Sequence, residues 1–91
     1  MLELGQVVVT RGVMDAINND AEFAAFVTES FGKYLYGDWG DMCNEDKKMN
    51  DAAVNGLDDR VVARYNHHTE DIYIITEWDR SATTILFCNE Y

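Results

Sequence analysis

The sequence predicts an α+β domain, an antiparallel sheet with two to three helices packed on one of its faces. Two observations predict this class. Residues 60–87 contain three short segments rich in β-branched and aromatic residues, separated by polar loops. The residues before them carry apolar side chains at helical spacing, and the chain has no proline to interrupt either pattern. The length of 91 residues and the hydrophobic content of 47% indicate one compact domain over residues 1–91.

The last two strands are expected at residues 72–78 and 83–87, joined by the turn-forming residues 79–82. A loop at this place puts Trp78 opposite Thr83. Alternate residues from Ile72 to Phe87 then share one face, which carries large apolar side chains and no charge. We therefore expect that face to be the core face of a hairpin.

A third strand is expected at residues 60–66, with Tyr65 opposite Ile72. A slip of one residue would bury Arg60 and Arg64, so the charge pattern specifies this register. The three segments then form a C-terminal antiparallel meander. Residues 6–10 are β-branched and flanked by glycines, and they are expected to join the sheet as an N-terminal edge strand.

Helical segments precede the meander. Residues 12–18 have the spacing of a short helix, and the clearest helix lies at residues 21–31, with Asp20 as a suitable N-cap. Either Gly32 or the tyrosines Tyr34 and Tyr36 are expected to end it. The apolar stripe of the clearest helix, which is expected to cover the sheet, consists of Phe23, Phe26, Val27 and Phe31.

A further helix is expected at residues 45–55, with Asn44 as its N-cap and acidic residues in its first turn. Gly56 suits the position just after its end, where a left-handed backbone is common, and Leu57 would pack back on Ala52.

Acidic residues dominate the chain. Seventeen aspartates and glutamates oppose seven lysines and arginines, which gives a formal net charge of −10. Such a chain repels nucleic acid and anionic membranes, so neither is expected as a direct partner. A charged partner would be a basic protein. Solubility alone is the competing explanation for the charge.

The N-terminal residues lack the basic and apolar regions of a signal peptide, and no run approaches the ~18 apolar residues of a membrane span. The two cysteines, Cys43 and Cys88, lie far apart and form no CxxC motif. We expect reduced thiols and a cytoplasmic location.

The acidic residues are densest in the middle of the chain, where residues 38–59 contain seven of them and only two lysines. A dense carboxylate face can imitate the field of a DNA duplex and occupy the basic groove of a DNA-binding protein. The residues expected to form this partner-binding face are Asp38, Trp39, Asp41, Glu45, Asp46, Asp51, Asp58 and Asp59. We expect the aspartates among them, except Asp46, to have only weak structural roles.

Trp39 has two alternative roles. It lies in the glycine-flanked loop 37–41, where the glycines indicate unusual backbone angles or a close backbone approach. A tryptophan in such a loop either caps the core, which is the preferred interpretation, or serves as an exposed anchor for a partner.

His67 and His68 form the only histidine cluster, with Glu70 nearby. Adjacent side chains diverge in extended backbone, and a metal site needs three or four converging ligands. The carboxylates of loop 37–41 do not have the spacing of an EF-hand. None of these motifs places a serine or cysteine nucleophile beside a histidine or another general base. We therefore expect no catalytic residue, no metal and no cofactor, and keep a metal-binding module or enzyme using these groups as an alternative.

Three stretches resemble a family of small "plasmid-related" proteins of bacterial plasmids, phages and integrative elements. They are GDWGD-x-x-x-ED at residues 37–46, IITEWDRSATTILF-x-x-EY at residues 74–91 and LGQVVVTRGV at residues 4–13. Cys88 stands where the family often has proline. The resemblance implies no catalytic residues. It implies a mobile-element setting, in which small acidic proteins often block host restriction or CRISPR systems.

The sequence therefore predicts a small acidic, non-enzymatic protein that binds and inhibits a basic, nucleic-acid-binding host defence protein, as a DNA mimic of the anti-CRISPR or antirestriction kind. The alternatives are the metal-binding module at His67 and His68 or at the carboxylates of loop 37–41, and a homodimeric interaction domain that pairs through a strand edge. The protein is expected to be a monomer or a homodimer.

Overall fold

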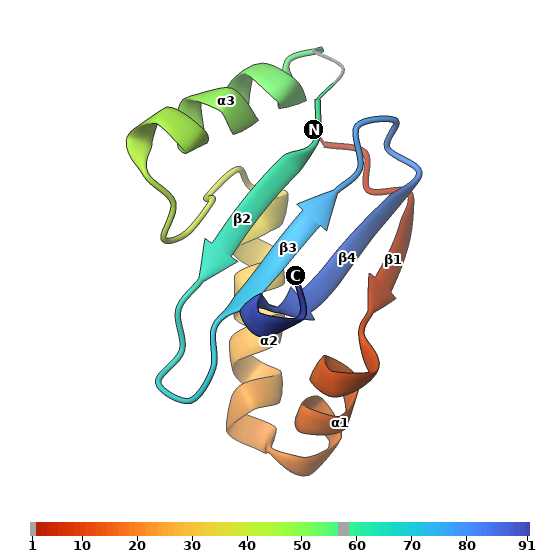
Figure 1. Cartoon of the computed structure of the whole chain (residues 1–91), viewed down its shortest axis with the longest axis vertical. Helices are drawn as coiled ribbons and strands as arrows, with labels where there is room; N and C mark the ends of the chain where they lie inside the picture. The colour runs from red at the N-terminus through yellow and green to blue at the C-terminus, as the bar shows by residue number, and fades with distance from the viewer. Residues whose placement is uncertain (1, 57–58) are drawn as a thin grey trace.

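A computed structural model describes residues 2–56 and 59–91, and confirms the α+β class (Figure 1). The sheet has four strands in the order β1-β4-β3-β2. No helix among the described residues is long and apolar enough to cross a bilayer. The elements are β1 (Gln6–Val9), α1 (Arg11–Asn19), α2 (Ala21–Leu35), α3 (Asn44–Val54), β2 (Val61–Tyr65), β3 (Ile72–Thr76), β4 (Ala82–Phe87) and the 3-10 turn η1 (Cys88–Glu90).

Strands β2, β3 and β4 form the predicted antiparallel meander, and the predicted register of Tyr65 opposite Ile72 is confirmed. Strand β1 is an edge strand, as expected, but it runs parallel to β4, with Gln6 opposite Ala82. The sheet is therefore mixed, and the expectation of a purely antiparallel sheet is wrong. A parallel neighbour needs a long crossover, which the chain between β1 and β4 supplies.

The hairpin between β3 and β4 turns one residue earlier than predicted. Thr76 lies opposite Thr83, and the Glu77 amide donates to the Ala82 carbonyl at 3.0 Å, so Trp78 is in the loop and is 61% exposed. The pairing shifts by two residues, which leaves every paired side chain on its predicted face. The cause is the turn itself, in which Arg80 adopts a left-handed φ of 60°.

Helix α2 extends to Leu35 with Tyr36 as its C-cap, so it ends at the tyrosines rather than at Gly32. Its last turn has an anchor in the core, the fully buried Tyr34. The predicted cap Asp20 is confirmed, since its Oδ1 accepts from the Glu22 and Phe23 amides. The predicted cap of α3 is wrong, because Cys43 rather than Asn44 is the N-cap.

Gly56 follows the end of α3 with a φ of 110°, as expected of a glycine in the left-handed region. The expected contact of Leu57 with Ala52 lies outside the described residues.

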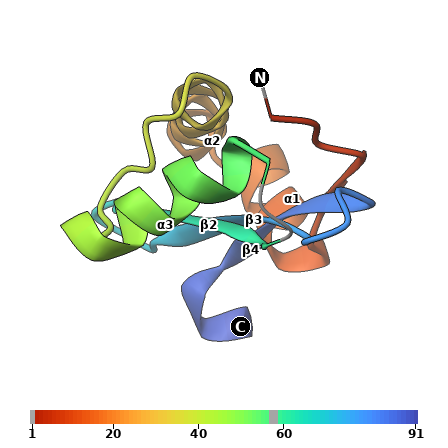
Figure 2. The same cartoon turned by 90° about the horizontal axis from the view of Figure 1, so that it is seen from above.

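Helices α2 and α3 cover one face of the sheet, and the C-terminal turn lies on the opposite side (Figure 2). Helix α1 packs against α2 and β4, and α3 packs along β2. The core between the layers contains Val13, Phe23, Val27, Tyr34, Trp39, Ala53, Val61, Ala63, Tyr65, Ile72, Ile74 and Ile85.

A chain of buried hydroxyl groups crosses this core. The Thr83 hydroxyl donates to the Leu4 carbonyl at 2.7 Å, and it lies 2.7 Å from the Thr76 hydroxyl. Thr76 Oγ1 in turn lies 2.7 Å from the hydroxyl of Tyr34. These hydrogen bonds therefore connect the N-terminal segment, strands β4 and β3, and helix α2. Burial raises the pKa of Tyr34 to about 12, because the charged phenolate would lose its hydration.

Candidate functional site

The loop at residues 37–41 has the backbone that its two glycines predicted. Gly37 and Gly40 have φ angles of 80° and 72°. A β-carbon at Gly40 would collide with the carbonyl oxygen of Arg64 in the edge strand β2. The second glycine is therefore required for a close backbone approach, and it lets the Asp41 amide donate to the Arg64 carbonyl at 2.7 Å.

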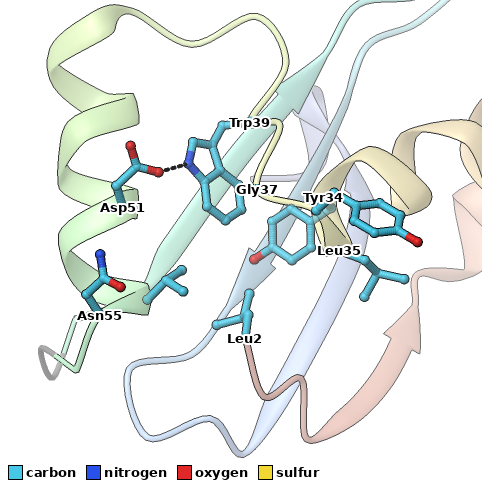
Figure 3. Close-up of a pocket in the computed structure, with 9 residues that line it drawn as sticks. Leu2, Tyr34, Leu35, Gly37, Trp39, Asp51 and Asn55 are labelled. Carbon is cyan, nitrogen blue, oxygen red and sulfur yellow. Dashed lines mark hydrogen bonds between the residues drawn. The ribbon is translucent and has the colours of Figure 1, made fainter.

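Trp39 is only 4% exposed, which decides between its two predicted roles. Its ring contacts Tyr34 edge-on, with centroids 5.4 Å apart, and its indole N–H donates to Asp51 Oδ1 at 2.9 Å (Figure 3). The ring therefore ties α3 to the end of α2. It belongs to the core and offers no exposed anchor to a partner.

A hollow of about 510 Å³ lies between the end of α2, α3 and the N-terminal segment (Figure 3). Leu2, Leu35 and Val54 give it an apolar wall, and Asp51 and Asn55 are its polar groups. Asp51 is the one carboxylate among the described residues that line the hollow, and the other titratable side chains of the lining are the tyrosines Tyr34 and Tyr36.

The expectation that the aspartates in this region have only weak structural roles is wrong. Asp38 Oδ1 accepts from the Gly40 amide at 3.0 Å, and Asp41 Oδ2 accepts from the Asn66 amide at 2.9 Å. Asp51 accepts from Trp39, and Asp59 Oδ1 accepts from the Arg60 amide at 2.8 Å. The predictions missed these roles because the donors of Asp41 and Asp51 are distant in sequence.

The predicted acidic residues that the structure describes remain exposed, and most of them line different hollows of the surface. Asp38 and Asp41 line a hollow beside α2 together with Glu29. Asp46 and Asp59 line another hollow, between α3 and β2. Asp51 lines the hollow of Figure 3, and Glu45 is exposed in the first turn of α3. Asp58 lies outside the described residues.

These carboxylates outnumber the two lysines of the region, Lys47 and Lys48 of α3. Among the residues that the structure describes, neither loop 37–41 nor α3 takes part in an ion pair. Three of the arginines and lysines elsewhere have other contacts. Arg64 binds Asp71 at 2.8 Å, Lys33 lies 3.8 Å from Glu29, and Arg80 donates to main-chain carbonyls.

The histidine side chains do not diverge as expected. The rings of His67 and His68 lie 4.2 Å apart, and both face Glu22 in the first turn of α2. Glu70, the expected neighbour, is not part of the group. Glu22 was missed because 45 residues separate it from His67, and no local pattern reveals such a contact.

The site is thus an exposed acidic surface over loop 37–41, α3 and Asp59, with a separate histidine cluster at the far end of α2. The sequence matches no protein-family model, and neither the curated proteins nor the solved structures contain a significant match to the chain.

Proposed function

We propose that this protein is a small, non-enzymatic binding protein whose acidic surface docks on a basic, nucleic-acid-binding partner. The acidic surface consists of Asp38, Asp41, Glu45, Asp46, Asp51 and Asp59. The observation that carries the proposal is the absence of any ion pair along loop 37–41 and α3 in the described part of the chain. Carboxylates that form no ion pair and outnumber the lysines beside them produce a field that attracts a basic surface.

The hydrogen bonds of the aspartates favour this role. Asp38 and Asp41 each use one carboxylate oxygen to accept from a main-chain amide, which fixes the position of the charge. The second oxygen stays available for an arginine or lysine of a partner. A charge already held in place loses less conformational entropy on binding than a mobile one, so these residues are pre-organised for a complex.

A nucleic-acid-binding partner is the chemical counterpart of such a surface. Its groove is lined with lysine and arginine to neutralise phosphates, and carboxylates can take the place of those phosphates. In the mobile-element setting that the resemblance implies, the partner is a host defence protein, and the complex blocks its access to DNA. Electrostatic steering would speed the encounter and make it sensitive to salt.

The test compares two variants with equal net charge. Asp38→Asn, Asp41→Asn and Asp59→Asn together remove three charges from the acidic surface, and asparagine keeps an oxygen to accept each hydrogen bond. Glu3→Gln, Asp15→Asn and Glu77→Gln remove three exposed charges elsewhere. Both triple variants change the formal charge from −10 to −7.

Each protein is immobilised and exposed to lysate from bacteria that carry restriction and CRISPR systems, and retained proteins are identified by mass spectrometry. We expect the wild type and the control variant to retain the same basic protein, which salt or duplex DNA displaces, and the acidic-surface variant to lose most of it. Equal retention by both variants, or equal loss, would show that no defined surface is used.

A further inference from the structure

We propose that Glu22, His67 and His68 form a binding site for Zn²⁺, at the junction of α2 and the loop between β2 and β3. The three side chains each place one ligand atom within 4.8 Å of the other two. The site shares no residue with the acidic surface, so it can be tested independently of the proposed function.

The distances within the cluster suit a tetrahedral ion. Zinc binds histidine nitrogen and carboxylate oxygen at about 2.0–2.2 Å, which separates neighbouring ligand atoms of a tetrahedron by about 3.4 Å. Glu22 Oε1 lies 3.2 Å from His68 Nε2 and 3.6 Å from His67 Nε2. Small rotations of the exposed Glu22 and His68 side chains would complete the geometry.

His67 is held as metal-binding histidines are held. Its side chain is only 7% exposed, and its ring packs at a tilt of 40° against Phe26, with centroids 4.5 Å apart. Its other nitrogen, Nδ1, lies 2.8 Å from the Thr69 hydroxyl. The Thr69 amide also donates to Nδ1, at 3.3 Å, so the structure admits either tautomer of the ring. Zn²⁺ at Nε2 would select the tautomer in which Nδ1 donates its proton to the hydroxyl oxygen, which is the outer-shell arrangement that orients a ligand.

The ligand set selects the ion. Two imidazoles with one carboxylate are typical of zinc, whereas Ca²⁺ and Mg²⁺ prefer oxygen ligands alone. Three protein ligands leave a fourth position for water or for a group of another molecule. The ion would join the start of α2 to a loop 45 residues further along the chain, and so brace the end of the domain away from α3.

The test is a Zn²⁺ titration against a chromophoric chelator, in a Cys43→Ser background that removes the exposed thiol. Glu22→Gln and His68→Ala are the informative variants, because their side chains are 69% and 68% exposed and their loss leaves the core intact. Glu29→Gln is the control, an exposed glutamate of the same helix.

We expect each ligand variant to weaken Zn²⁺ binding by about tenfold or more, and the control to leave it unchanged. In NMR spectra, Zn²⁺ would shift the ring nitrogens of both histidines, which a simple ion pair would not explain. Equal affinity in all variants, or unchanged histidine signals at saturating Zn²⁺, would overturn the proposal.

Discussion

Tyr34 is the single residue that connects most of the molecule, because it contacts Trp39 with its ring and Thr76 with its hydroxyl while being fully buried. Neither role could be predicted from its position near the end of a helical stripe. Tyr34 lies beyond the predicted stripe, and its polar partner comes from a strand 42 residues away. Long-range hydrogen bonds of this kind leave no local pattern in a sequence.

The raised pKa of Tyr34 predicts a loss of stability at alkaline pH. Its value is about 12 in the folded protein and 10.0 in an ordinary tyrosine, so between these values the unfolded chain releases a proton that the folded chain keeps. The contribution is fully present below pH 10 and falls as the pH rises toward 12, by about 2–3 kcal/mol in all.

Urea unfolding from pH 8 to 11.5 measures this effect, with Tyr34→Phe as the comparison. At pH 8 the variant is expected to be about 1 kcal/mol less stable, because it lacks one buried hydrogen bond. Above pH 10 its stability should fall less steeply than that of the wild type. Parallel curves would show that the Tyr34 proton does not contribute. Burial also raises the pKa of Tyr65, which is present in both proteins, so the difference between the two slopes reports the effect of Tyr34.

The elements of the sheet show what alternation can predict and what it cannot. The pattern of alternate apolar residues places Ile72, Ile74 and Ile85 in the core, as found. The error in the hairpin loop does not affect this prediction, because a shift of two residues in the pairing of β3 with β4 leaves each side chain on the same face of the sheet. The direction of β1 could not be predicted in this way. A short β-branched segment has the same pattern whether it pairs with its neighbour in parallel or antiparallel.

The two edges of the sheet are not equally protected from pairing with a strand of another molecule. At the β2 edge, the Asn50 side chain donates to the Val62 carbonyl at 2.7 Å and accepts from the Val62 amide at 3.2 Å. The Asp41 amide covers the Arg64 carbonyl beside it. At the other edge, β1 has only four residues and leaves Val7 and Val8 exposed. A strand-paired homodimer, if the protein forms one, would use β1.

Arg80 connects two elements, the β3–β4 hairpin and the end of α3. Its guanidinium donates to the Ala53 carbonyl at 2.8 Å and to the Asp59 carbonyl at 2.7 Å, while its backbone is left-handed. We expect Arg80→Ala to cost about 2 kcal/mol, since charged hydrogen bonds to carbonyls at a helix end are lost. Urea unfolding at neutral pH measures the cost.

A second variant, Arg80→Gly, separates the contribution of the side-chain hydrogen bonds from the cost of the left-handed backbone. Glycine loses the same hydrogen bonds but adopts the positive φ without the cost of a β-carbon, which is about 1 kcal/mol. The glycine variant should therefore be more stable than the alanine variant by about that amount. If alanine is equal or better, the hairpin is not held by the left-handed residue in the way the structure indicates.

At the scale of the whole molecule, the same charge that favours a basic partner opposes the fold. The net charge of −10 is carried by a body with extents of 38 × 26 × 21 Å. At 0.01 M salt the screening length is about 30 Å, so carboxylates on all sides repel one another, whereas at 1 M salt it is about 3 Å. The unfolded chain separates these charges and relieves the repulsion.

Salt is therefore expected to stabilise the free protein, raising its free energy of unfolding by about 1 kcal/mol between low and high concentration. Urea unfolding in potassium chloride measures this, because urea adds no ions. The variant with Asp38→Asn, Asp41→Asn and Asp59→Asn should gain less, since its charge falls from −10 to −7. The same salt should weaken binding to a basic partner, so fold and complex respond in opposite directions. Stability that is unchanged or lowered by salt would mean that the carboxylates are too well separated to repel, and they would then be too dispersed to act as one acidic surface.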